Sequence, residues 1–211
     1  MSNTAGPEQI TVFSDYVCPF CYLGRHSLDR YQATREEPLE IDWRPFDLRA
    51  QKRNPDGSID HSVDDGKDEA YFEQAKENVR RLQEEYDVEM DLELSRDVDS
   101  LPAQMAAVRV SEEYGYDTWL GFDRGIFEAL WSEGRDIGDA DVLADVAEES
   151  GVDPDLVRDA VTDEALRERV RGLFEEATQQ GVTGVPTFAY DGYGARGAVP
   201  PEQLERLVEG N

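Results

Sequence analysis

Cysteine, histidine and long apolar runs are scarce in this chain of 211 residues, which contains two cysteines and two histidines. Two cysteines exclude a small scaffold held together by several disulfides. The longest apolar runs, such as residues 106–108, are far shorter than the ~20 residues of a membrane-spanning helix. The first ten residues have neither a basic segment nor an apolar core, so we expect no secretory signal peptide and a cytoplasmic location.

Positive charge is scarce as well. The chain has 21 basic residues against 48 acidic ones, which gives a net charge of −27. A surface this negative repels nucleic acid phosphates and anionic membranes, so we expect neither as a partner. Acid-rich, lysine-poor chains are typical of salt-loving organisms, because a Debye length of roughly 3 Å at 1 M salt screens the repulsion. We therefore predict a halophilic protein, with an ordinary acidic cytosolic protein as the alternative.

The N-terminal region predicts a strand–helix–strand unit. Residues 9–13 are short and β-branched, and residues 39–46 alternate apolar and polar side chains, as strands do. Between them we expect a helix from Cys18, with Pro19 in its first turn, to about Arg35. Such a unit is normally a right-handed parallel crossover.

Helices dominate the middle of the chain, and strands return at its end. Residues 49–68 are rich in turn-forming residues and predict a loop. Helical periodicity then predicts helices near residues 71–86, 100–115, 118–132, 139–149, 154–161 and 166–181. Residues 186–190 and 195–199 are expected to form a hairpin around a turn at 191–194, and residues 200–208 a last helix. The helices therefore interrupt one small sheet.

The motif that carries chemistry is Cys18-Pro19-Phe20-Cys21, where the first strand meets the first helix. A CxxC pair in this position is typical of redox proteins. The helix dipole and the free N–H groups favour a thiolate at the first cysteine, and such thiols have a pKa of about 3.5 to 7.5 against about 8.5 for a free thiol. We therefore predict Cys18 as the nucleophile and Cys21 as the resolving thiol, which exchange electrons through a mixed disulfide.

Three other interpretations of the cysteine pair stay open. A zinc site normally takes about four ligands, and beyond the two cysteines only His26 and His61 are soft ligands, so no metal site is predicted. A purely structural disulfide would close too small a loop to stabilise the fold much. Two inert buried thiols are the third alternative.

Several other residues have two interpretations. Asp15, three residues before Cys18, is a candidate proton shuttle, although a local capping or turn role is favoured. Arg25 and His26 are expected to solvate the surface of the first helix. Four aromatic side chains at helical spacing are expected in the core rather than in a substrate groove: Trp119, Phe122, Phe127 and Trp131.

Four segments of the sequence carry a resemblance to a known family: SDYVCPFCYLG, WRPF, GVTGVPTF and GAVPPEQL. They resemble the DsbA-like thioredoxin-fold oxidoreductases, in particular the FrnE-like branch. The resemblance implies an α/β thioredoxin fold with an inserted all-helical domain. Residues 1–48 plus 182–211 would form the thioredoxin-like domain, and residues 49–181 the helical insertion.

The resemblance also assigns residues to the site. It implies a redox pair at Cys18 and Cys21, shaped by Pro19 and Phe20. It implies a cis-proline at Pro186, preceded by Val185, in a loop that faces the cysteines and presents backbone groups to a peptide or thiol substrate. Proline is the residue at which a cis bond costs only about 0.5–1 kcal/mol.

The predicted function is a thiol–disulfide oxidoreductase that acts on thiol or disulfide substrates without a metal or organic cofactor. The central Pro-Phe dipeptide and the missing signal peptide depart from the secreted DsbA pattern. The direction (oxidation, reduction or isomerisation), the electron partner and the oligomeric state therefore stay open. Two alternatives remain: a glutathione-dependent isomerase or transferase of the 2-hydroxychromene-2-carboxylate isomerase type, and a non-catalytic holdase that uses the helical block.

Overall fold

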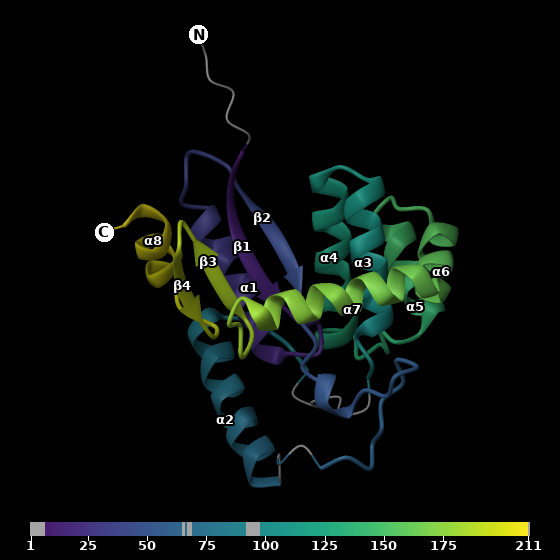
Figure 1. The fold of residues 1–211 in the computed structure, drawn as a ribbon. Helices are drawn as coiled ribbons and strands as arrows, with labels where there is room; N and C mark the ends of the chain where they lie inside the picture. Colours follow the sequence, from purple (N-terminus) through teal and green to yellow (C-terminus); the bar gives the residue numbers. More distant parts are fainter. Residues whose placement is uncertain (1–6, 65, 67–68, 92–97, 211) are drawn as a thin grey trace.

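A computed structural model describes residues 7–64, 66, 69–91 and 98–210 of the protein (Figure 1). Both ends of the chain contribute strands to one sheet, namely β1 (Glu8–Ser14), β2 (Leu39–Pro45), β3 (Thr187–Tyr190) and β4 (Tyr193–Arg196). Helix α1 (Pro19–Gln32) joins the first two strands, and α8 (Pro201–Glu209) follows the last. The described part of the segment between β2 and β3 contains η1 (Ala50–Lys52), α2 (Glu69–Tyr86), α3 (Leu101–Glu113), α4 (Tyr116–Trp131), α5 (Ala140–Glu149), α6 (Pro154–Thr162) and α7 (Glu164–Gln179).

The sheet has the strand order β2–β1–β3–β4. Strands β1 and β2 run parallel, whereas β3 runs antiparallel to both β1 and β4. The predicted strand–helix–strand unit and the C-terminal hairpin are therefore confirmed. Because Thr187 pairs with Phe13, the start of β3 lies beside the end of β1, directly before the cysteine motif.

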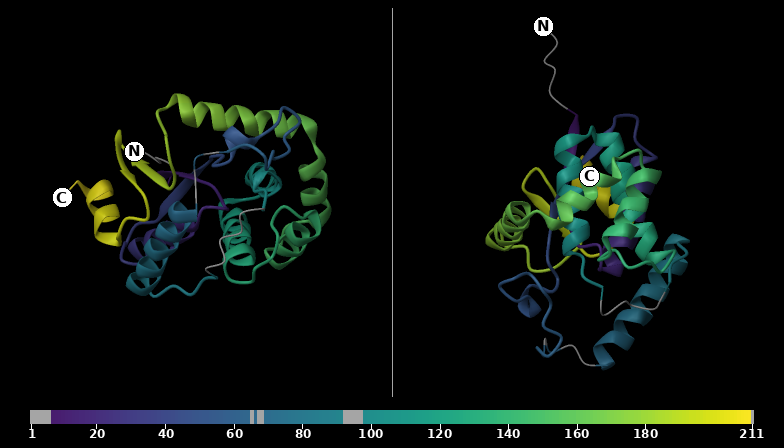
Figure 2. Two further views of the ribbon diagram at one scale, coloured as in Figure 1. Left: turned by 90° about the horizontal axis from the view of Figure 1, so that it is seen from below. Right: turned by 90° about the vertical axis from the view of Figure 1, so that its right-hand side faces the viewer.

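Helices lie on both faces of the sheet, as Figure 2 shows. Ile10 of β1 shares the main core cluster with Leu23 of α1, while Phe13 packs with Ala177 of α7 on the other face. Successive strand residues point to opposite faces, so the even and odd positions of β1 serve different helices. The main cluster also includes Phe122 of α4, which shows that the sheet and the inserted helices share one core.

The fold class predicted from the sequence is confirmed, because α2 to α7 stand between β2 and β3. Helices α3, α4, α5 and α6 pack against one another, whereas α2 contacts α1 and α7 contacts β2. Helix α4 also contacts α1, so helices of the predicted insertion touch the sheet unit directly at several places. The division into residues 1–48 plus 182–211 and residues 49–181 stays a prediction.

Acidic caps explain where several inserted helices begin. The carboxylate of Asp139 accepts a hydrogen bond from the N–H of Asp141 at the start of α5. Asp153 and Asp163 make the same contact at the starts of α6 and α7. Because a capping side chain satisfies an N–H group that has no partner within the helix, part of the acidic composition serves local structure.

The predicted hairpin is wrong in its boundaries. The turn consists of Asp191 and Gly192 alone, and Tyr193 already pairs with Tyr190. Both turn residues have positive φ (46° and 82°), as a two-residue type I′ turn requires, and this turn matches the twist of the strands. Strand β4 therefore starts two residues earlier than predicted and ends at Arg196.

Two helices and one loop also differ from the prediction in detail. Helix α1 ends at Gln32 rather than near Arg35. Only the C-terminal half of α2 is buried, at Val79, Leu82 and Tyr86, while Tyr71 is 52% exposed. The loop predicted at 49–68 holds η1 and turns, and residues 65, 67 and 68 lie outside the described residues. In the described ranges, no helix combines the length and the apolar character needed to span a membrane.

Candidate active site

The cysteine motif lies where β1 passes into α1. Cys18 is the N-cap residue of the helix, in extended conformation, and its carbonyl oxygen accepts hydrogen bonds from the N–H groups of Cys21 (3.0 Å) and Tyr22 (3.3 Å). Pro19 occupies the first helical turn, where its missing N–H costs no hydrogen bond. The sulfur of Cys18 therefore lies at the positive end of the helix dipole, as predicted.

A loop from the far end of the chain faces Cys18. The Val185–Pro186 peptide bond is cis, and Cys18 Sγ lies 3.6 Å from the carbonyl oxygen of Val185. Gly24 allows the loop to approach α1, because a Cβ atom at Gly24 would lie only 3.1 Å from Pro186 Cγ and 3.2 Å from Phe188 Cζ. Segments 167 residues apart thus meet at the first thiol.

Both thiols are free and buried: Cys18 is 4% exposed and Cys21 is 2% exposed. Burial raises the pKa of Cys21 well above its ordinary value, and hydrogen bonding and charge from Cys18 raise it further. The hydroxyl of Ser14 and the N–H of Asp15 act in the opposite direction. The structure therefore brings Cys18 and Cys21 together and keeps Cys21 as a neutral thiol at pH 7.

Asp15 is fully buried beneath the motif. Its Oδ1 accepts from the N–H of Val17 (3.3 Å), and its Oδ2 accepts from the N–H of Leu48 (2.9 Å). Burial raises the pKa of Asp15 to about 6, and the nearby carboxylate of Asp47 contributes in the same direction. The bond to Val17 is the expected local turn contact, and the bond to Leu48 ties the motif to the segment after β2.

Arg25 is not a surface residue, and that prediction is wrong. Its side chain is only 7% exposed, and its Nη2 donates to Oδ2 of Asp123 on α4 at 2.7 Å. His26 packs edge-on against Tyr22, with ring centroids 4.6 Å apart, and burial lowers the pKa of His26. The first helix therefore faces α4 along a side that we had expected to be solvated.

The expectation for the aromatic residues of α4 is confirmed. The side chains at these positions are at most 4% exposed and lie in the core: Trp119, Phe122, Phe127 and Trp131. Trp119 also lines the cavity between β2, α3 and α4. The remaining predicted site residue, Phe20, is partly buried and packs on the same core cluster. Neither its side chain nor that of Pro19 has a polar group to offer to the thiols.

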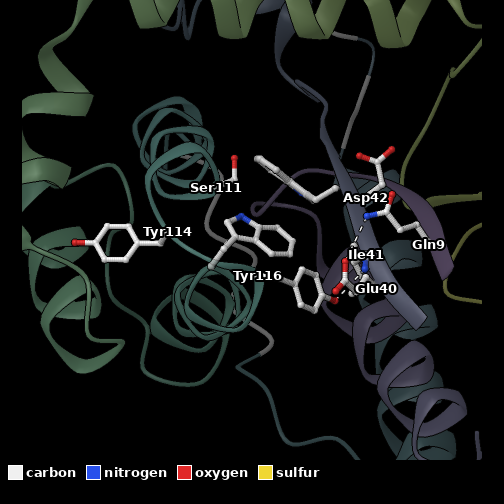
Figure 3. Close-up of a pocket in the computed structure, with 9 residues that line it drawn as sticks. Gln9, Glu40, Ile41, Asp42, Ser111, Tyr114 and Tyr116 are labelled. Atoms are coloured by element: carbon white, nitrogen blue, oxygen red, sulfur yellow. Dashed lines mark hydrogen bonds between the residues drawn. The ribbon is translucent and has the colours of Figure 1, made fainter. Parts of the chain in front are cut away.

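A cavity of about 290 Å³ lies away from the cysteines, between strand β2 and helices α3 and α4 (Figure 3). Tyr116 points toward β2, where its hydroxyl accepts a hydrogen bond from the N–H of Ile41 at 2.9 Å. Tyr114 points away from β2, and its hydroxyl accepts from the N–H of Asp153. Cys18 and Pro186 do not line this cavity, so it is separate from the candidate active site.

Metal-binding geometry is absent from the residues that the structure describes: they contain no cluster of three or more His, Cys, Asp or Glu side chains suited to a metal ion. His26 lies on α1 beside Tyr22, and no second histidine joins it in that contact. The chemical groups gathered at the site are thus two thiols, a buried carboxyl group and the backbone of the Val185–Pro186 loop.

A mixed four-stranded sheet of this order, with helices inserted between β2 and β3, defines a protein of thioredoxin fold. The family model for the DSBA-like thioredoxin domain matches residues 9–209. The chain therefore belongs to the DSBA-like thioredoxin domain family, and the resemblance seen in the sequence is confirmed. A curated relative is the uncharacterized protein YwbO of Bacillus subtilis (strain 168), which is 27% identical over 205 residues covering 94% of each chain.

Solved structures share the fold at lower identity. A probable DsbA oxidoreductase from Streptomyces coelicolor has a TM-score of 0.74 and 22% identity, covering 96% of this chain and 90% of its own. A 2-hydroxychromene-2-carboxylate isomerase has a TM-score of 0.70 and 18% identity, covering 94% and 92%. The cytosolic disulfide reductase DsbM from Pseudomonas aeruginosa, in a structure with glutathione, has a TM-score of 0.63 and 18% identity, covering 94% and 92%. These likenesses are consistent with the FrnE-like branch.

Proposed function

We propose that the protein is a thiol–disulfide oxidoreductase that uses Cys18 and Cys21 as its redox pair. The observation that carries the proposal is the position of Cys18: it caps α1, and its sulfur lies 3.6 Å from the Val185 carbonyl oxygen while Cys21 lies buried beside it. A thiol at the start of a helix, followed one helical turn later by a second thiol, is the arrangement that disulfide exchange requires.

The reaction follows from this asymmetry. The Cys18 thiolate attacks one sulfur of a substrate disulfide, a mixed disulfide forms, and the other substrate sulfur leaves as a thiolate that takes up a proton. Cys21 then loses its proton and attacks the Cys18 sulfur, which expels the second substrate thiol and leaves a Cys18–Cys21 disulfide. Two electrons pass from the pair to the substrate, and the reverse sequence oxidises a substrate dithiol.

Substrate binding is assigned to the loop at Val185 and Pro186. The backbone of this loop lies next to the sulfur that reacts, so an extended peptide or a small thiol can bind alongside it through main-chain hydrogen bonds. Pro19 and Phe20 shape the opposite wall with apolar surface. We assign thiols and disulfides as partners and the cytoplasm as the location, which is supported by the likeness to a cytosolic disulfide reductase.

Two cysteine variants test the proposal. Cys18→Ser is expected to abolish the reduction of insulin disulfides by dithiothreitol, since the attacking sulfur is gone. Cys21→Ser is expected to accumulate a mixed disulfide that sodium dodecyl sulfate gels reveal without reductant, since the resolving sulfur is gone. Full activity of the Cys18→Ser protein would reject the assignment.

The same variants separate the two alternatives. A glutathione-dependent isomerase would retain isomerase turnover in the Cys21→Ser protein when glutathione is added, because that chemistry does not need a cysteine pair. A holdase would protect an aggregating client as well without both cysteines as with them. Either result, together with unchanged disulfide exchange in the Cys18→Ser protein, would replace the proposed function.

A further inference from the structure

Tyr16, two residues before Cys18, is held by helix α4 through three contacts. Its hydroxyl donates to Oδ1 of Asp123 at 2.9 Å, and its carbonyl oxygen accepts from Nε1 of Trp131 at 2.8 Å. Its ring meets Phe127 edge-on, with centroids 4.8 Å apart. Tyr16 is only 1% exposed. Its three contacts fix the backbone, the ring and the hydroxyl of this residue, which lies in the loop between β1 and α1.

Asp123 connects this loop to helix α1 as well. The carboxylate is fully buried, and its second oxygen accepts from Nη2 of Arg25 at 2.7 Å. The only other carboxylate in ion-pair range of Arg25 among the described residues, Asp29, is 3.9 Å away. Asp123 thus binds both sides of the Cys18 junction, the loop before it through Tyr16 and the helix after it through Arg25.

Folding stability alone does not explain why the Asp123–Arg25 ion pair is buried here. Replacing a buried ion pair by well-packed apolar side chains is often neutral or stabilising, because burying two charges is costly. The surroundings of Tyr16 are aromatic, so a phenylalanine would fill the same space. What the polar contacts add is orientation, since hydrogen bonds fix the direction of a group that packing only confines.

The group so oriented is the loop that carries the first thiol. Residues 15–17 form a turn between β1 and α1, and the N–H of Cys18 donates to the carbonyl oxygen of Asp15 at 3.1 Å. Any rotation of Tyr16 is transmitted through one residue to Cys18. Such a rotation changes both the place of the sulfur at the helix end and its 3.6 Å approach to the Val185 oxygen.

We propose that Asp123, together with Arg25, is a positioning residue that fixes Cys18 through Tyr16, so that inserted helix α4 sets the reactivity of the first thiol. We call Tyr16, Asp123, Arg25 and Trp131 the Tyr16 network. The proposal extends the proposed function by naming what orients its nucleophile. It concerns thiol reactivity, which is measurable whether or not the protein turns over a disulfide substrate.

The test is the rate at which iodoacetamide alkylates Cys18 at pH 7 in protein that carries Cys21→Ser. Tyr16→Phe and Asp123→Asn are each expected to slow alkylation about tenfold, because small misplacements of a reacting group have effects of this size. Tyr31→Phe is the matched control. It removes another buried phenol, which lies on α1. The hydroxyl of Tyr31 accepts from Arg35 at 2.6 Å and donates to Glu209 at 3.3 Å, so its hydrogen bonds lie outside the Tyr16 network.

The proposal also predicts how the effects of two substitutions combine. Because Tyr16 and Asp123 act through one hydrogen bond, the double variant is expected to react no more slowly than the slower single variant. Trp131→Phe, which removes the bond to the Tyr16 carbonyl, is expected to slow alkylation independently. All rates are compared on protein that circular dichroism shows to be folded.

Three outcomes would overturn the proposal. Alkylation that is unchanged or faster in Tyr16→Phe would show that the network does not activate the thiol. An equal loss in Tyr31→Phe would show a general effect of destabilisation. Full additivity in the double variant would show that the two side chains act separately. Failure of the proposed function is a different result, since it appears as absent disulfide exchange in a protein whose Cys18 is still reactive.

Discussion

Replacing Asp15 by asparagine is expected to change how stability depends on pH. Burial raises the pKa of Asp15 from an ordinary value of 3.8 to about 6. Because the folded-state pKa lies above the unfolded one, ionisation of Asp15 opposes folding. Its penalty is absent below the unfolded pKa, grows as the pH rises from 3.8 toward 6, and is constant above that.

The size of the effect follows from the two pKa values. The linkage relation gives a penalty of about 0.5 kcal/mol at pH 4 and about 3 kcal/mol at pH 8. Asparagine does not ionise, so the variant escapes this penalty. It also loses one acceptor oxygen, which leaves the N–H of Leu48 or Val17 unpaired at a cost of about 1–3 kcal/mol. That cost is independent of pH, so the difference in unfolding free energy between Asp15→Asn and the parent is expected to shift by about 2.5 kcal/mol toward the variant between pH 4 and pH 8.

Urea unfolding of the reduced protein, followed by circular dichroism at constant high KCl, measures this difference. Glu205→Gln, an exposed position on α8, is the control, because it removes one negative charge without touching the site. The reasoning is refuted if Asp15→Asn and the parent differ by the same free energy at both pH values. Equal pH profiles for Asp15→Asn and Glu205→Gln would refute it as well.

Three further predictions follow from the structure. Gly24→Ala is expected to destabilise the protein by about 1–3 kcal/mol and to lower disulfide-exchange activity, because the new methyl group presses on Pro186 and Phe188. Gly172→Ala is the control and is expected to stabilise the protein by about 0.5–1 kcal/mol, since among the described residues nothing outside its own stretch of helix lies within 4 Å of the added Cβ. Raising KCl from 0.1 M to 3 M is expected to raise the melting temperature by on the order of 10 °C, since it screens a net charge of −27, and a flat profile would contradict the halophilic interpretation. Phe20→His is expected to raise the reduction potential of the cysteine pair by at least about 30 mV, because a cationic imidazole stabilises a nearby thiolate; an unchanged or lower potential in equilibrium titrations would show that position 20 does not influence the pair.

Local signals explain why the cysteine site was predictable. Cys18 and Pro19 mark a helix start by themselves, and the spacing to Cys21 places both thiols on one helical face. The loop that faces Cys18 comes from a distant part of the sequence. Only the resemblance of residues 181–188 (GVTGVPTF), which include Pro186, to a known family indicated its position. The structure shows that the parallel unit and the hairpin share one sheet, in which β3 pairs with β1.

The Tyr16 network was not predicted, because its partners are about 100 residues apart in sequence. Arg25 was expected at the surface because its side chain is charged. Its buried partner, Asp123, lies 98 positions further along the chain. One signal was present: Asp123 interrupts the apolar face that Trp119, Phe122 and Ile126 form on α4. A charge on a buried face requires a partner of opposite sign, so Asp123 indicated a buried cation. The sequence did not indicate which basic residue it is.

The most direct test of the redox pair is an equilibrium titration of the protein against glutathione redox buffers. The thiols are trapped with an alkylating reagent, and peptide mass spectrometry identifies the linked sulfurs. We expect a single two-electron transition, in which the protein loses two hydrogens and acquires a bond between Cys18 and Cys21. Protein that stays fully alkylated in the most oxidising buffer, or that holds only separate glutathione adducts on the two cysteines, would contradict the assignment.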